Sequence, residues 1–212
     1  DTCDRIVRSP GAFAKFKKAA ALLEGSGLRY LIKLVTMKDN YQEVMVSFRL
    51  IRRLGWKCSI PFSFVPRRDK NPLRNAQISS QQLDPKELAA FIKKYHPGYL
   101  RKRLDSCGQQ GGDAASCNAG TIACTITATG RLAMCQYVLE GAPDLLRTPF
   151  IKAWRSFRPK KTPLQKQRKA CGSCRHTQYC CWCPGRAYLT VGSQEKKIPR
   201  LCQAMEMVSS QS

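Results

Sequence analysis

The sequence Cys171-Gly-Ser-Cys174-Arg-His-Thr-Gln-Tyr-Cys180-Cys-Trp-Cys183 decides how the second half of this chain can be organised. Nine of the 12 cysteines lie between Cys117 and Cys202. The sequence has no secretory leader pattern, so thiols at this density are better explained by a bound metal than by disulfides. The first half has ordinary helix and strand patterns that need no disulfide. We therefore interpret the cysteine-rich region as an iron–sulfur site.

The spacing of the cysteines indicates how four sulfurs can be gathered. Cys171/Cys174 and Cys180/Cys183 each have the two-residue gap that lets neighbouring sulfurs converge from one turn, and a four-iron cluster takes one thiolate per iron. Longer loops would return the other candidates, which are Cys117, Cys124, Cys135 and Cys202. The alternative is a zinc site, with sulfurs in a tetrahedron and no redox role. Zinc sites usually separate two close pairs by a longer loop than the five residues found here.

Charge and hydropathy limit the partners of the chain. The 212 residues carry 37 Lys and Arg against 14 Asp and Glu, a net charge of +23, so an anionic partner is expected. No run of 18 apolar residues is present, and we expect a cytoplasmic protein without a membrane partner. The basic stretch 158–169 lacks the interleaved aromatic residues of nucleic-acid sites, so nucleic acid is not the expected partner. A zinc-stabilised basic module that binds nucleic acid is the alternative hypothesis.

The first half shows alternating helical and strand patterns. Apolar residues recur at helical spacing over 13–23 and 41–54, and dense apolar runs over 28–35 and 57–65 are typical of buried strands. This order predicts βα units and a parallel sheet. Residues 1–8 and 66–82 are predicted loops, and Asp84-Pro85 is expected to begin a helix that ends near Tyr95.

The second half carries fewer regular elements. A hairpin is predicted over 125–128 and 132–136, turning at Thr129-Gly130, and a short helix over 148–157. The tail 205–212 has no clear signal. We place the domain boundary at the glycine-rich segment that begins at residue 108, which gives domains 1–107 and 108–212.

The cysteine pattern resembles a known family. Cys117-Asn-Ala-Gly120, Gly130-x4-Cys135, Cys171-x2-Cys174-x5-Cys180, Cys183-Pro-Gly-Arg and the distal Cys202 are similar to the SPASM domain of radical S-adenosylmethionine (radical SAM) peptide and protein maturases. The first half resembles the end of the radical SAM barrel through Ser9-Pro-Gly-Ala-Phe13. The resemblance implies an α/β fold. The final βα units of a partial (β/α)6 barrel would be followed by a small cysteine-rich α+β SPASM domain with a hairpin.

By the same resemblance, the chain would hold two auxiliary four-iron clusters. The first set of ligands would be Cys117, Cys124, Cys135 and Cys183, and the second set would be Cys171, Cys174, Cys180 and Cys202. The family usually has three residues between the third and fourth cysteines of the main run, but two stand before Cys183. Whether Cys181 replaces Cys180 or Cys183 therefore stays open.

The activity that the resemblance implies belongs to a longer protein. The family's Cys-x3-Cys-x2-Cys motif, which binds the S-adenosylmethionine cluster, is not in this sequence. We therefore expect the C-terminal part of a maturase, with S-adenosylmethionine and a third cluster only in the full-length parent. No catalytic residue can be named, and the auxiliary clusters would serve electron transfer. The implied partners are a peptide or protein substrate, with an acidic leader in one version, and a reductant such as flavodoxin or ferredoxin. His176 is expected to be a solvent-facing side chain that tunes the cluster potential.

Overall fold

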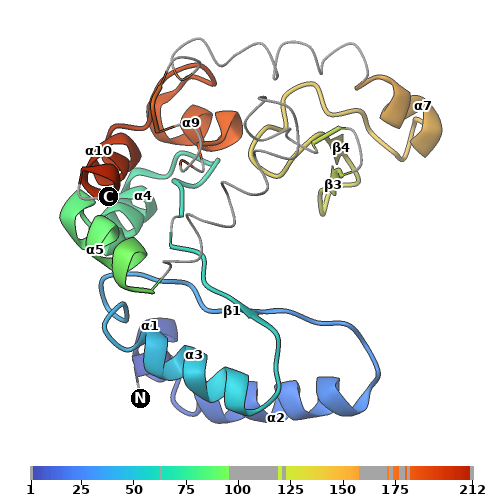
Figure 1. The fold of residues 1–212 in the computed structure, drawn as a ribbon. Helices are drawn as coiled ribbons and strands as arrows, with labels where there is room; N and C mark the ends of the chain where they lie inside the picture. Colours follow the sequence, from blue (N-terminus) through green and yellow to red (C-terminus); the bar gives the residue numbers. More distant parts are fainter. Residues whose placement is uncertain are drawn as a thin grey trace. The chain divides into compact units, whose positions relative to one another are not determined.

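The computed structural model in Figure 1 describes residues 2–62, 64–95, 119–120, 123–157, 171, 174–176, 180 and 182–210. These residues form two compact units. The first comprises Asp1–Phe64 and Pro72–Leu83, and the second comprises Val65–Asn71 and Asp84–Ser212. The predicted boundary between residues 107 and 108 lies outside the described residues and stays a prediction.

A parallel strand pair lies at the centre of the first unit. β1 (Ile32–Lys33) pairs with β2 (Cys58–Ser59), Ile32 opposite Cys58, and α3 (Val44–Arg53) makes the crossover between them. The predicted order of strand, helix and strand is thus confirmed. Both strands are much shorter than predicted: in the part of the chain that the structure describes, each pairs with one neighbour only, and Leu28 and Leu31 are exposed. The described part contains no closed barrel, and the partial radical SAM barrel stays a prediction.

Helices cover this strand pair. α2 (Ala12–Gly25) matches the predicted first helix, and its Ala20 packs with Ile51 and Trp56 in the core of the unit. α1 (Thr2–Val7) and α4 (Pro72–Gln81) occupy segments that were predicted to be loops, and those two predictions were wrong. The Asp4 carboxylate accepts hydrogen bonds from the backbone N–H groups of Phe13 (2.8 Å) and Gly11 (2.7 Å), which joins α1 to α2 and lowers the pKa of Asp4.

The second unit has two centres of packing. In one, α5 (Pro85–Tyr95) packs on α10 (Pro199–Ser209), with Ile92 and Ala204 fully buried. The predicted start of α5 is confirmed by a capping box, in which the Asp84 carboxylate accepts from the Glu87 N–H (2.9 Å) and the Glu87 carboxylate accepts from the Asp84 N–H (2.8 Å). α10 occupies most of the tail for which no element was predicted.

The other centre contains the predicted hairpin and short helix. β3 (Thr125–Ile126) and β4 (Leu132–Ala133) pair antiparallel, and α7 (Phe150–Arg155) contacts β4. Leu132, Ala153 and Phe157 form their shared core. α9 (Pro184–Val191) follows later in the chain and was not predicted. Among the described residues, no helix is long and apolar enough to cross a membrane.

Candidate metal centre

A cavity in the second unit is walled largely by cysteines. The side chains that line it are Cys171, Cys174, His176, Cys180, Trp182, Lys197, Cys202, Met205 and Glu206. Its volume is about 50 Å³, whereas a single water molecule needs roughly 10 to 15 Å³. The space therefore admits a group larger than one ion. All four cysteines of the second predicted set are present.

Short turns and one anchored helix bring these cysteines together. The Cys174 N–H donates to the Cys171 carbonyl (3.2 Å), so the two-residue gap closes a turn, and the Cys180 N–H donates to the His176 carbonyl (2.9 Å). Cys202 lies in the first turn of α10, where its N–H donates to the Ile198 carbonyl (3.0 Å). The packing of α10 on α5 fixes the position of that turn. Two separate stretches of chain thus meet at one cavity.

The electrostatics of Cys202 reflect this gathering of thiols. Burial raises the pKa of Cys202, and the charges of Cys171 and Cys174 raise it further, while Lys197 opposes the rise. Negative charge gathers here as thiolates form, and a bound cation favours that charged form. The donor set therefore fits a cationic metal centre ligated by thiolates.

A single metal ion and a four-iron cluster require different distances between the sulfurs of their ligands. Within the described part of the chain, no three His, Cys, Asp or Glu side chains stand close enough to hold one metal ion. A single zinc ion bound at about 2.3 Å would draw its sulfurs to roughly 3.8 Å from one another. A four-iron cluster takes a wider spacing, because iron and sulfide lie between its thiolates. Four cysteines at one cavity supply thiolates that either a four-iron cluster or a zinc ion can take.

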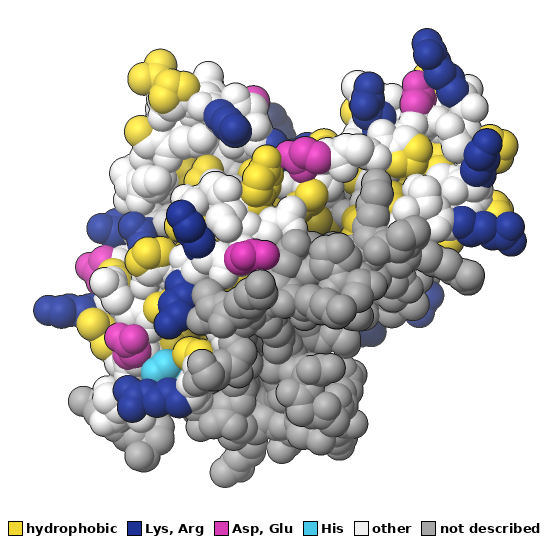
Figure 2. Space-filling view, turned by 90° about the horizontal axis from the view of Figure 1, so that it is seen from above, with side chains coloured by type: hydrophobic (Ala, Val, Ile, Leu, Met, Phe, Trp, Pro, Cys, Tyr) yellow, Lys and Arg dark blue, Asp and Glu magenta, His cyan; other side chains and the backbone are white. Residues whose placement is uncertain are grey.

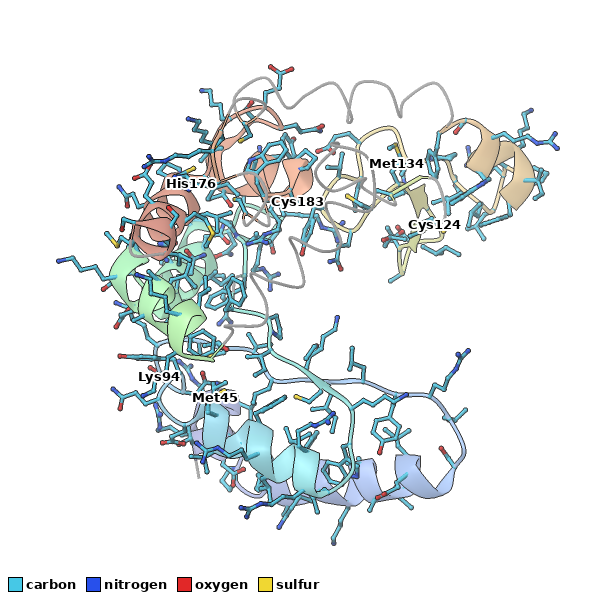
Figure 3. The ribbon with its side chains drawn as sticks, viewed as in Figure 1. Met45, Lys94, Cys124, Met134, His176 and Cys183 are labelled. Carbon is cyan, nitrogen blue, oxygen red and sulfur yellow. The ribbon has the colours of Figure 1, made fainter. Side chains whose placement is uncertain are left out.

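The first predicted set is only partly gathered. Cys183 is the N-cap of α9, and a Cβ placed on Gly185 would lie 3.5 Å from the Cys135 Sγ, so Cys135 lies near the start of α9. Cys124 is exposed, and Figure 3 shows it beside the hairpin, well apart from Cys183 at the start of α9. Cys117 and Cys181 lie outside the described residues. The shared cage of this first set stays a prediction.

Other side chains at the cavity were identified from the sequence only in part. His176 is buried (6% exposed), so the expectation that it faces solvent was wrong. Trp182 and Lys197 line the cavity, and the Trp182 Nε1 donates to the Lys196 carbonyl (3.1 Å). Trp182 lies between Cys180 and Cys183 and was predicted to pack over the cluster region, whereas Lys197 carries no local signal.

The basic stretch 158–169 lies outside the described residues. On the face drawn in Figure 2, the dark-blue Lys and Arg side chains stand apart, with apolar and other surface between them.

Three curated proteins match most of the chain, and all are named AdoMet-dependent heme synthase. The protein of Nitratidesulfovibrio vulgaris is 26% identical over 91% of this chain and 59% of its own length. The protein of Methanosarcina barkeri is 22% identical over 94% of this chain and 63% of its own length. The protein of Oleidesulfovibrio alaskensis is 24% identical over 94% of this chain and 57% of its own length. No family model matches the chain, and no solved structure matches it.

The chain spans about three fifths of the length of these relatives. AdoMet is S-adenosylmethionine, the molecule that gives the radical SAM family its name. None of the three relatives is named as a peptide or protein maturase, so their names do not support that finer prediction. At low identity, the matches relate this chain to the radical SAM family of iron–sulfur proteins.

Proposed function

We propose that this chain is the iron–sulfur portion of a radical SAM protein, and that the cavity holds a four-iron cluster. The proposed ligands are Cys171, Cys174, Cys180 and Cys202. The observation that carries the proposal is the meeting of these four side chains at one cavity. Thiolates are the ligands that such clusters take, and the relatives support the same class of protein.

The surroundings of the cavity have separate roles in this proposal. Lys197 offsets part of the negative charge that four thiolates bring, and Trp182 and Met205 limit the access of water. The core between α5 and α10 keeps Cys202 in place. A bound four-iron cluster supplies reversible one-electron transfer.

A second cluster is the finer part of the proposal. Cys135 and Cys183 would hold it together with Cys117 and Cys124. The support is the resemblance of the cysteine spacing to the SPASM domain, together with the approach of Cys135 to the start of α9.

For the longer protein we propose an AdoMet-dependent step of heme formation, because three relatives carry that name. Peptide modification is the second candidate, and the cysteine spacing favours it. The net charge of +23 suits an anionic substrate, and porphyrin carboxylates or an acidic leader peptide would both supply one. We also propose a reductant such as flavodoxin or ferredoxin and the cytoplasm as the compartment, since thiols stay reduced there.

Metal analysis tests the cluster. The 212-residue chain is purified without oxygen, reconstituted with iron and sulfide, and analysed for iron, sulfide and zinc. We expect a brown protein with about four irons for one cluster or about eight for two. A colourless protein with stoichiometric zinc would reject the proposal in favour of the zinc alternative.

Ligand binding separates the two candidate substrates. A porphyrin with free carboxylates is titrated into the chain and followed by its main absorbance band, and an acidic peptide is followed by fluorescence anisotropy. Saturable binding of the porphyrin alone supports the heme candidate. Saturable binding of the peptide alone supports the maturase candidate instead.

A further inference from the structure

His176 is a buried polar side chain in the wall of the cysteine cavity. It is 6% exposed, it follows Cys174 by two residues, and its carbonyl accepts the Cys180 N–H. A histidine buried this deeply requires partners for both ring nitrogens. Among the described residues, the structure supplies a partner for one of them only.

Arg175 fixes the tautomer of this ring. Its Nε donates to the His176 Nε2 at 3.1 Å, and a guanidinium has no acceptor, so Nε2 must accept. In a neutral imidazole the proton then resides on Nδ1. The ring therefore offers one N–H donor, and its position is determined by the neighbouring residue.

The Nδ1 atom is buried and has no hydrogen-bond partner among the described residues. A buried N–H without an acceptor is costly, so a missing acceptor is expected nearby. Four of the nine residues that line the same cavity are cysteines, and sulfur accepts hydrogen bonds. A cluster held by those cysteines would present both thiolate and sulfide sulfurs.

We infer that the Nδ1–H of His176 donates a hydrogen bond to a sulfur of the cluster held in this cavity. The inference rests on the proposed function. Such a donor stabilises the reduced cluster, which carries more negative charge, and therefore raises the reduction potential. His176 acts here as a positioning and tuning residue. The hydrogen bond from Arg175 to Nε2 leaves the ring proton of His176 on Nδ1.

The test compares two substitutions by redox titration followed by EPR. His176→Leu removes the donor, and we expect the equilibrium constant for reduction of the cluster to fall about fivefold. For a one-electron couple this corresponds to a reduction potential about 40 mV lower. His176→Asn keeps an N–H near the Nδ1 position, and its potential should stay near that of the wild type. The signal to follow is the one that Cys202→Ser removes.

Iron content separates the possible failures. A His176→Leu protein with full iron and an unchanged potential overturns the inference and leaves the proposed function intact. Loss of iron in both His176 variants, with the fold retained, also overturns it, because His176 would then be a ligand. A wild-type chain that binds no cluster fails at the proposed function itself.

A second measurement does not depend on how the His176 variants fold. A chain with His96→Gln keeps one histidine and is labelled with ¹⁵N-histidine. Pulsed EPR of the reduced cluster should detect a weak ¹⁵N coupling from His176. Absence of any coupling contradicts the hydrogen bond, and a coupling as strong as that of a directly bound nitrogen contradicts it as well.

Discussion

The two predicted cysteine sets lie in different surroundings within the second unit. The set around α10 lines one cavity, where turns at Cys174 and Cys180 face a helix anchored on α5. The set around α9 has Cys135 near Cys183, but Cys124 is exposed on the hairpin. The comparison teaches that thiols gather where a short turn meets a helix fixed in a core. A thiol on a hairpin depends on a longer return of the chain.

The largest expected effect comes from removing a ligand at each place. Cys202→Ser should remove the native form of the cluster in the α10 cavity, since one iron loses its thiolate, and the chain should lose part of that cavity's four irons. Cys124→Ser should leave those four irons in place. Iron and sulfide analysis after identical reconstitution measures both.

Cys3→Ser is the matched control, because Cys3 is exposed in the first unit and belongs to neither set. If Cys124→Ser and Cys202→Ser remove the same iron, the two sets do not form separate sites. Cysteines of both sets would then bind one cluster.

The next effect concerns the helix pair that supports Cys202. Ile92→Ala removes a fully buried side chain (0% exposed) and should lower the free energy of unfolding by about 2 to 5 kcal/mol. Urea unfolding of the metal-free protein measures it. Leu146→Ala, at a side chain that is 84% exposed, should change stability by less than about 0.5 kcal/mol. Equal effects of the two substitutions would contradict the α5–α10 core.

The sequence predicted the local geometry of the α10 cavity but not the helix packing that completes it. The two-residue gap between Cys171 and Cys174 predicts their turn, because that geometry is local. The approach of Cys202 comes from helix packing, and only the resemblance suggested it. α10 was missed although Leu201, Ala204, Met205 and Val208 recur at helical spacing behind Pro199.

Strand lengths in the first unit show the opposite failure. Leu28 to Val35 is a largely apolar run with Arg29 and Lys33 in it, yet only Ile32–Lys33 is a strand. An apolar run indicates what a segment can bury, but strand length is set by the neighbouring strand. Burial of His176 was unpredictable for a related reason, since its neighbours come from other segments.

A smaller effect tests the α9 site. A Cβ on Gly185 would lie 2.8 Å from the Tyr137 Cβ, which is too close, and 3.5 Å from the Cys135 Sγ, which is ordinary contact, so Gly185→Ala forces Tyr137 and α9 apart. We expect a loss of about 1 to 3 kcal/mol in the free energy of unfolding. Iron at the α10 cavity should stay unchanged.

Gly25→Ala is the matched glycine control. A Cβ there meets nothing within 4 Å, and Gly25 ends α2, so the change should be neutral or stabilise by up to about 1 kcal/mol. Thermal unfolding of both variants measures the difference. Equal stability of the two would show that the Tyr137 segment, which carries Cys135, does not approach α9 closely.

The smallest effect concerns Trp182, which links the two sites because it lines the cavity and directly precedes Cys183. Trp182→Phe keeps an aromatic wall but removes the donor to the Lys196 carbonyl, and should cost about 0.5 to 1.5 kcal/mol of unfolding free energy. If the two sites form independently, iron content should not change. A loss of iron beyond that of the α10 cavity would mean that a side chain of one site holds the other in place. The two cysteine sets would then not form independent sites.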